Sequence, residues 1–476
     1  MSRRAVIGLV GLVGLVGVGG LLGAGCDPDP PAGDQTTSRV GTATFPARLN
    51  RALDVLFVVD DSGATAEWQT SLAQGFPAFV AALSTVEGGL PDVHIGVVSS
   101  NVGTGGVALG GCSTATEPDG DDGNLLTNNC AGLTAAYLED LRLPDGTRLR
   151  NYTGELATVF SCMAQLGTGG CNFEAHLESA YRALQPGKNP GFLRPAADLA
   201  VIILGDEDDC SALPGGALFG DPMATIASPL GPRTSFRCWE FGVACDDEPN
   251  PRAFGTYTGC RPRVGSPYLH DVTRYVDYLK GLKSSPRHVA VAGIIGEVDA
   301  LGTSVVGPDP DDATRPFLQA SCSSTFGVAA PGHRLKAFVD GFGDHGLVSS
   351  ICRDEHRTAL AQVGALVTRT LGVPCLDLHL ADRNPTLPGV QAECSVTDVL
   401  APDGAGRSEV VIPACDTTGG AAPCWRFAAD AAACPSSPEH RTVVVDRGGA
   451  AVPDETVVEV QCVVCDPATA PAGTCS

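Results

Sequence analysis

Residues 53–64, Leu-Asp-Val-Leu-Phe-Val-Val-Asp-Asp-Ser-Gly-Ala, decide the fold that we expect for this chain. The apolar run Val55–Val59 is rich in β-branched residues and too short for a globular helix, so it predicts a strand buried on both faces. The run ends at Asp60, Asp61 and Ser62. Polar side chains at the carboxyl end of such a strand lie where open α/β sheets bind ligands. Carboxylate and hydroxyl oxygens are hard ligands, which suit Mg²⁺, Mn²⁺ or Ca²⁺.

Three further apolar runs repeat this pattern. The runs are His94–Val98, Ala200–Leu204 and Val289–Ile295. Between them lie segments with apolar residues at helical spacing, and this alternation indicates an α/β fold. We expect a doubly wound, mostly parallel, Rossmann-like sheet that helices cover on both faces. The residues that follow the three strands, Ser99, Asp206 and Glu297, should then share one edge of the sheet with the first acidic pair.

Six helices are expected from the apolar spacing. They cover residues 65–84, 154–165, 173–184, 269–282, 335–342 and 355–371. Pro77 should kink or interrupt the first of them, because proline lacks the backbone N–H that a helix interior uses. Long loop-like insertions separate the elements, at about residues 102–153, 210–265 and 298–331.

The pattern changes from residue 375 onward. Helical periodicity ends, and short Val-rich pieces alternate with Gly, Pro and Cys, which is typical of a small disulfide-rich β-domain. We therefore divide the chain into a signal peptide (residues 1–25), a flexible tether (26–49), an α/β domain (50–373) and a Cys-rich β-domain (374–476).

Composition limits the possible partners. The chain has 476 residues and a formal net charge of −23, and it has no basic stripe that could neutralise phosphates. Nucleic acid is therefore excluded as a partner. An unknown protein or another ligand on a cell surface fits an acidic, soluble body better.

The cysteines and the N-terminus indicate export. Nineteen cysteines without repeated metal-binding spacings are typical of an oxidising compartment. Two arginines precede a long apolar run, which is the layout of an export signal. Residues 22–26, ending at Cys26, resemble a bacterial lipobox, so we expect Cys26 to be lipidated and to hold the protein on a membrane of the cell envelope. An uncleaved membrane anchor is the alternative, because the run is nearly long enough to span a bilayer.

The other eighteen cysteines divide evenly. Ten lie between Cys112 and Cys352 and eight between Cys375 and Cys475, so each domain can close its own disulfides. In the α/β domain the first disulfide candidates are Cys112, Cys130, Cys162 and Cys171. The pair Cys462-Val-Val-Cys465 has redox spacing, but without a strand-to-helix context we expect a structural bridge.

The motif Asp60-Asp61-Ser62-Gly63 after an apolar strand resembles the metal-ion-dependent adhesion site of von Willebrand factor A domains. Residues 199–209, Leu-Ala-Val-Ile-Ile-Leu-Gly-Asp-Glu-Asp-Asp, are similar to the strand of that family that ends in its last acidic ligand. The resemblance implies that Asp60, Ser62 and Asp206 bind a divalent cation, with Asp208 or Asp209 assisting through water. It also implies that a carboxylate of a partner protein completes the coordination.

The chain departs from the family pattern at two ligands. Ala64 stands where the family has a second Ser, so that oxygen is missing. The expected Thr aligns with Cys171, which we expect to pair with Cys162, and Thr168 is the substitute ligand. The alternative is that the acidic and hydroxyl residues of the first motif cap the following helix and bind no metal.

No catalytic signature is present in the sequence. It contains no Gly-x-Ser-x-Gly, no His-Glu-x-x-His and no phosphate-binding Gly-x-x-x-x-Gly-Lys-Ser/Thr motif. We therefore predict a lipid-anchored binding protein and no enzyme. The alternatives are an extracytoplasmic metal-dependent hydrolase, with Asp60 and Asp206–Asp209 holding its cation, and a purely structural envelope protein.

Overall fold

The structure is a computed structural model. It describes residues 39–476 apart from residues 115, 247–249, 354, 388, 403–405, 416–421, 432–433, 435–436, 454, 469, 471–474 and 476. Residues 40–476 form one unit. The expected signal peptide and the lipidation residue Cys26 lie outside the described residues. Within the described part, no helix combines the length and the apolar character needed to cross a membrane.

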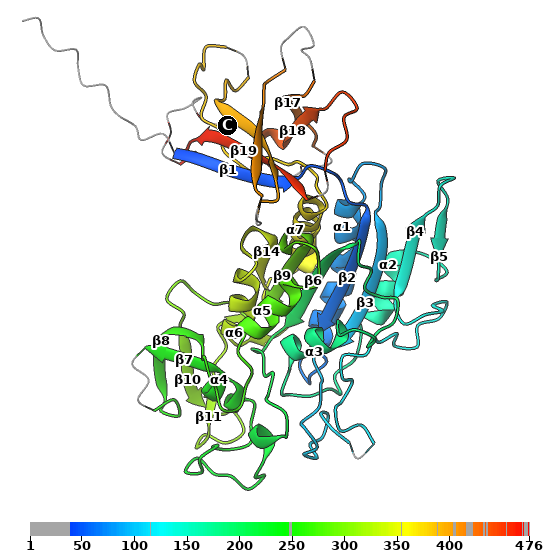
Figure 1. Ribbon diagram of the computed structural model, residues 1–476. Coiled ribbons are helices and arrows are strands. Elements are labelled where there is room, and N and C mark those ends of the chain that lie inside the picture. The colour runs from blue at the N-terminus through cyan, green and yellow to red at the C-terminus, as the bar shows by residue number, and fades with distance from the viewer. Residues whose placement is uncertain are drawn as a thin grey trace, which may run out of the picture. The chain divides into compact units, whose positions relative to one another are not determined.

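A seven-stranded sheet forms the centre of the α/β part (Figure 1). Its strand order is β14-β9-β6-β2-β3-β4-β5. The bounds are β2 Ala52–Val59, β3 Asp92–Ser99, β4 Leu138–Arg142, β5 Arg148–Arg150, β6 Asp198–Gly205, β9 Val289–Ile295 and β14 Gly346–Ser350. The five strands from β14 to β3 are parallel, whereas β4 and β5 are antiparallel. The expected α/β class is thus confirmed, with a mixed sheet in which the parallel pairing stops at β3.

Helices lie on both faces of this sheet. The α-helices of the whole chain are α1 Ala66–Leu83, α2 Leu156–Met163, α3 His176–Ala183, α4 Phe236–Gly242, α5 Thr273–Lys280, α6 His333–Asp340 and α7 His356–Thr370. Alternate residues of β2 point to opposite faces, as a strand requires. Phe57 therefore joins one core with α1, α2 and α7, while Leu56 and Val58 join the other with α3, α5 and α6.

Two glycines allow α1 and α7 to pack closely. A Cβ on Gly75 would lie 2.9 Å from the Leu360 side chain, and a Cβ on Gly364 would lie 2.5 Å from the Cβ of Ala82. Contacts this short require a residue without a side chain. Helix α1 is continuous through Pro77, so the break that the sequence suggested there does not occur.

The predicted loop insertions contain structure of their own. Residues from two of them form a four-stranded antiparallel sheet in the order β11-β10-β8-β7. Its bounds are β7 Val243–Asp246, β8 Gly255–Pro262, β10 Ser304–Pro308 and β11 Pro316–Leu318, and a small ladder follows at β12 Cys322–Ser323 and β13 Val328–Ala329. Single turns of 3-10 helix lie at η1 Ala217–Phe219, η2 Pro286–His288, η3 Gly343–His345 and η4 Pro438–His440.

The C-terminal strands form two antiparallel ladders. A four-stranded sheet has the order β1-β19-β15-β16, and β17 pairs with β18. The bounds are β1 Arg39–Pro46, β15 Cys394–Leu400, β16 Ser408–Ile412, β17 Cys424–Ala429, β18 Arg441–Asp446 and β19 Thr456–Val464. Residues 39–46, which we expected in the flexible tether, are therefore a strand. Their alternating burial completes a sheet whose other members come from the far end of the chain.

Nine disulfides join the eighteen described cysteines, and none links the two groups that the count separates. The bonds are Cys112–Cys171, Cys130–Cys162, Cys210–Cys238, Cys245–Cys260, Cys322–Cys352, Cys375–Cys434, Cys394–Cys462, Cys415–Cys424 and Cys465–Cys475. The even division of cysteines is confirmed. The expected Cys171–Cys162 bond is wrong, because each of these residues bonds a cysteine of the preceding insertion. The residues of the Cys-x-x-Cys pair bond to separate partners.

Candidate metal centre

Neighbouring strands bring Asp60 and Asp206 to the same edge of the sheet. Strands β2 and β6 are parallel, with Val59 beside Leu204, and the Asp60 N–H donates to the Leu204 carbonyl at 3.0 Å. Both carboxyl groups are buried. Burial and then the negative charge of Asp206 raise the pKa of Asp60, and burial raises the pKa of Asp206. These two acids meet where the sequence placed them.

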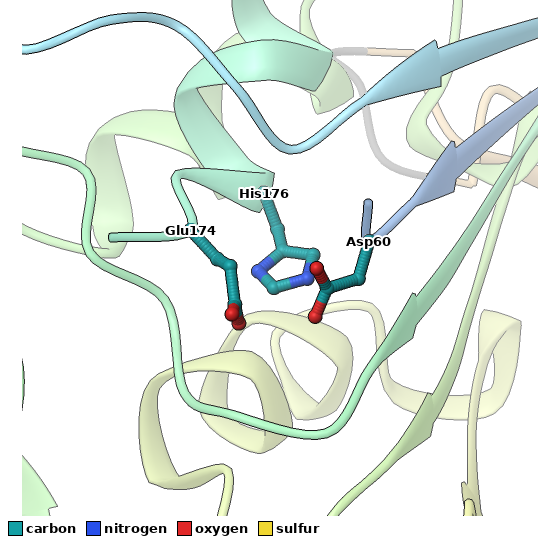
Figure 2. Close-up of side chains that lie close together, drawn as sticks. All are labelled: Asp60, Glu174 and His176. Atoms are coloured by element: carbon teal, nitrogen blue, oxygen red, sulfur yellow. The ribbon is translucent and has the colours of Figure 1, made fainter. Parts of the chain in front are cut away.

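Asp60 forms a cluster with Glu174 and His176, neither of which was predicted from the sequence. One ligand atom from each of Asp60, Glu174 and His176 lies within 4.8 Å of the others, and all three side chains are buried. Figure 2 shows the His176 ring between the two carboxyl groups. The signal that could have found them is an acid and a histidine two residues apart, just after the Gly-Gly turn that precedes a helix.

The start of helix α3 fixes the position of His176. The Leu177 N–H donates to Asp209 Oδ1 at 2.9 Å, and the Glu178 N–H donates to Ser211 Oγ at 2.9 Å. Groups from the loop after β6 thereby satisfy the free N–H groups of the first turn. Because other residues cap the helix, His176 and Glu174 remain available to the cluster.

Gly205, the last residue of β6, makes room for the imidazole ring. A Cβ at this position would lie 2.3 Å from His176 Nε2 and 2.7 Å from Cε1. No real Cβ contact is that short, so any side chain at residue 205 would displace the ring. The close approach of ring and backbone explains why a glycine precedes Asp206.

Several buried polar atoms of the cluster have no hydrogen-bond partner among the described residues. They are Asp60 Oδ2, Glu174 Oε2, Asp206 Oδ1 and both ring nitrogens of His176. The described part of the chain also provides no Lys or Arg within ion-pair distance of the three carboxylates. Burying such groups without partners is unfavourable unless a proton or a cation compensates them. The arrangement therefore has the chemistry of a cation site.

The electrostatics of the cluster suit a neutral imidazole beside acids. Burial and then the charge of Asp60 raise the pKa of Glu174. Burial lowers the pKa of His176 to about 4, and the nearby Asp209 opposes this shift. At neutral pH the ring is therefore neutral and can accept a metal ion through a nitrogen lone pair.

The backbone around Asp60 is held by side chains outside the cluster. Asp60 Oδ1 accepts a hydrogen bond from the Ser62 N–H at 2.8 Å, which leaves Oδ2 for a ligand. Gln69 Nε2 donates to the Asp60 carbonyl at 2.8 Å and to the Gly167 carbonyl at 2.7 Å. Helix α1 has Thr65 at its N-cap position, with no side-chain cap. The alternative that Asp60 and Ser62 only cap this helix is therefore wrong.

Other residues expected at the site have different positions. Thr168 is exposed, whereas Asp60 and Ser62 are buried. Cys171 is bonded to Cys112 and offers no oxygen. Ala64 lines two pockets beside Asp206 without adding a ligand.

Asp208 and Asp209, in the loop after β6, both accept hydrogen bonds from Arg334. Asp209 Oδ2 accepts from Arg334 Nη2 at 3.0 Å, and both side chains are fully buried. Asp208 accepts from the backbone N–H groups of Arg334 and Leu335 at the start of α6. These acids hold the loop after β6 in place and are not free to assist a cation through water.

Two open pockets flank the end of β2. One, of about 580 Å³, is lined by residues that include Ser62, Glu174, Asp206, Arg233 and Arg315. The second, of about 660 Å³, is lined by residues that include Asp61, Asn101, Asp121 and Gly170. Because neighbouring residues at a strand end point apart, Asp60 faces the cluster and Asp61 faces the second pocket.

Asp61 has its own buried environment. Burial and then the charge of Asp121 raise the pKa of Asp61 to about 7. A Cβ on Gly170 would lie 2.2 Å from the Asp61 carboxyl group, so this carboxyl group packs directly against the backbone of the Gly-Gly turn. Asp61 therefore shares no proton with Asp60.

Neither a comparison with known protein families nor one with curated proteins finds a match for the chain. Three solved structures are similar to it at low scores: the pilus adhesin SpaC from Lactobacillus rhamnosus GG in its open conformation (9% identity, TM-score 0.31), the pilus adhesin RrgA from Streptococcus pneumoniae (11%, 0.28) and the human COPII-coat protein Sec24c (9%, 0.28). They match 90%, 89% and 90% of this chain, which spans only 41%, 58% and 42% of their lengths. The TM-scores are too low to carry an argument about fold or function.

Proposed function

We propose that this chain is an extracytoplasmic binding protein of the von Willebrand factor A type, which binds a protein or a surface polymer at the carboxyl edge of its central sheet. The observation that carries the proposal is the convergence of Asp60 and Asp206, buried and with unpartnered oxygens, beside an open pocket of about 580 Å³. Ligands of open α/β sheets bind at this edge.

The compartment follows from the cysteines. Nine disulfides persist in an oxidising environment and are rare in the cytosol. Lipidation at Cys26, which would hold the body on a membrane of the cell envelope, remains part of the proposal.

A divalent cation at this edge would be held by Asp60, Ser62 and Asp206. Such a cation supplies an open coordination position for an acidic group of the partner. The pocket itself offers Arg233 and Arg315, and Arg315 is already paired with Asp309 at 3.1 Å. The chain would thus present a cation and fixed charges of both signs to its ligand. We propose no catalytic step.

The test is a binding screen of the full chain. Immobilised extracellular proteins and polysaccharides are probed in Mg²⁺, Mn²⁺ or Ca²⁺, and again in EDTA. The variant Asp206→Asn is compared with Asp344→Asn, which removes the same charge from an exposed acid in η3. We expect binding that EDTA and Asp206→Asn abolish and that Asp344→Asn leaves unchanged.

Two outcomes would overturn the proposal. Binding that neither EDTA nor Asp206→Asn affects would remove the sheet edge as the binding surface. Cation-dependent turnover of peptide, ester or phosphate substrates, lost in Asp206→Asn, would replace the binding role by a hydrolase.

A further inference from the structure

We propose that Asp60, Glu174 and His176 form a site for a transition-metal ion of the Zn²⁺ class, in preference to Mg²⁺ or Ca²⁺. The inference rests on the proposed function in one respect, since both use the same edge of the sheet. The inference goes beyond the proposed function by naming the class of ion and by assigning Glu174 and His176 as ligands.

The spacing of the three side chains fits one shared ion. Their ligand atoms lie within 4.8 Å of one another. Ligands about 2.1 Å from a tetrahedral Zn²⁺ lie about 3.4 Å apart, so the three ligand atoms must approach one another by about 1 Å to share an ion. Asp60 contributes Oδ2, because the Ser62 N–H already occupies Oδ1.

His176 differs from the other buried histidines of the chain. His94 Nδ1 lies 2.9 Å from the Phe192 carbonyl, His356 Nε2 lies 3.0 Å from the Ile351 carbonyl, and His333 Nε2 lies 2.8 Å from Ser304 Oγ. Both ring nitrogens of His176 lack a partner of hydrogen-bond geometry among the described residues. A histidine that only fills core space would normally be hydrogen-bonded, as these three are.

The donor set decides which class of ion fits. Mg²⁺ and Ca²⁺ take oxygen ligands, whereas imidazole nitrogen suits Zn²⁺, Cu²⁺, Ni²⁺ and Fe²⁺. The group here is an imidazole from His176 with carboxylates from Asp60 and Glu174. A nitrogen donor beside two carboxylates shifts the preference toward the transition metals.

The fixed backbone supports the same assignment. Gly205 leaves room for the ring, and the capped start of α3 fixes the backbone from which His176 projects.

The experiment measures metal affinity of the full chain directly. Zn²⁺, Mg²⁺ and Ca²⁺ are each titrated by calorimetry into the EDTA-treated, dialysed protein, and Co²⁺ is titrated with a visible spectrum recorded at each step. The variants are His176→Asn and Glu174→Gln. The control is His345→Asn, a histidine of η3 outside the cluster. Circular dichroism in EDTA verifies that each variant is folded.

We expect one equivalent of Zn²⁺ to bind on the order of 100-fold or more tightly than Mg²⁺ or Ca²⁺. His176→Asn should weaken Zn²⁺ binding by about 100-fold and alter the Co²⁺ spectrum, while His345→Asn should change neither. Equal affinity for Mg²⁺ and Zn²⁺, unchanged in His176→Asn, would overturn this inference but leave the proposed function intact. Absence of binding by any of the four ions would overturn this inference and the cation part of the proposed function. The binding screen in EDTA would then decide whether a metal-free edge still binds a ligand.

Discussion

The sharpest test of the geometry is Gly205→Ala, which removes no ligand. Gly205 lies within β6 with ordinary strand backbone, so alanine is conformationally acceptable there. The new methyl group, however, would lie 2.3 Å from His176 Nε2. The ring must move, and it is fully buried. We therefore expect the variant to be less stable than the wild type.

The size of this loss of stability follows from two opposing effects. Overpacking of a filled interior costs about 1–3 kcal/mol. Replacing glycine by alanine in permitted backbone contributes about 0.4–1 kcal/mol of stability, because it restricts the unfolded chain. The difference predicts a loss of about 1–2 kcal/mol in the free energy of unfolding, measured by urea denaturation with the disulfides intact.

A double-mutant cycle identifies the cause of this loss. In a His176→Ala background the ring is absent, so Gly205→Ala should be neutral or slightly stabilising. The coupling energy between the two sites should then reach at least about 1 kcal/mol. Gly293→Ala in β9 is the matched control, because its Cβ would lie 3.2 Å from the nearest side-chain atom. Gly293→Ala should be tolerated more readily than Gly205→Ala.

If Gly205→Ala lowered the free energy of unfolding equally in the wild type and in His176→Ala, the placement of the His176 ring over residue 205 would be refuted. The Gly205→Ala variant also tests the metal site. Its affinity for Zn²⁺ should be weaker than that of the wild type, although every proposed ligand is present. A variant that is destabilised yet binds Zn²⁺ with wild-type affinity would show that the ring position and the metal site are unrelated.

Three further predictions concern other parts of the chain. Burial lowers the pKa of His333 to about 4 from its usual 6.5, so the unfolded chain takes up a proton first as the pH falls. The contribution of His333 to stability, present above pH 6.5, should therefore fall by about 3 kcal/mol toward pH 4, and the difference in unfolding free energy between wild type and His333→Asn should change by this amount; a difference that does not vary with pH would contradict it. Replacing both Cys112 and Cys171 by Ser opens a loop of 59 residues and should cost about 4 kcal/mol, and peptide mapping of the wild type should find these two cysteines linked. Arg334→Met leaves Asp209 buried without its ion partner and should cost about 3–5 kcal/mol in denaturant unfolding, whereas a loss below about 1 kcal/mol would show that this pair is solvated.

Much of the central fold could be predicted from local sequence. The four apolar runs became β2, β3, β6 and β9, and Val289–Ile295 matches β9 residue for residue. Such runs can be recognised in a sequence because strands buried on both faces carry few polar residues. The edge strands β5 and β14 and the penultimate strand β4 were missed because they are short and partly exposed. The sheet formed by the insertions was missed because its strands are short and because its central pairing, β8 with β10, joins two different insertions.

The candidate site also contains residues that could be predicted from the sequence and residues that could not. Asp60 and Asp206 could be assigned from sequence, since each directly follows a buried strand and the strands are neighbours in a parallel sheet. Glu174 and His176 could not, because their roles depend on how the first turn of α3 meets the end of β6. The Cys112–Cys171 bond was likewise beyond the sequence, as cysteine counts limit pairings but do not choose among them.

The sequence by itself determined the strands of the central sheet, the acids at its edge and the oxidising compartment, because hydrophobic periodicity, strand ends and cysteine number are local or additive properties. Only the tertiary structure decided that β1 joins the C-terminal sheet, that Arg334 donates hydrogen bonds to Asp208 and Asp209, and that an imidazole stands beside Asp60. These contacts join residues far apart in the chain. Packing in three dimensions selects such contacts, and no local pattern encodes them.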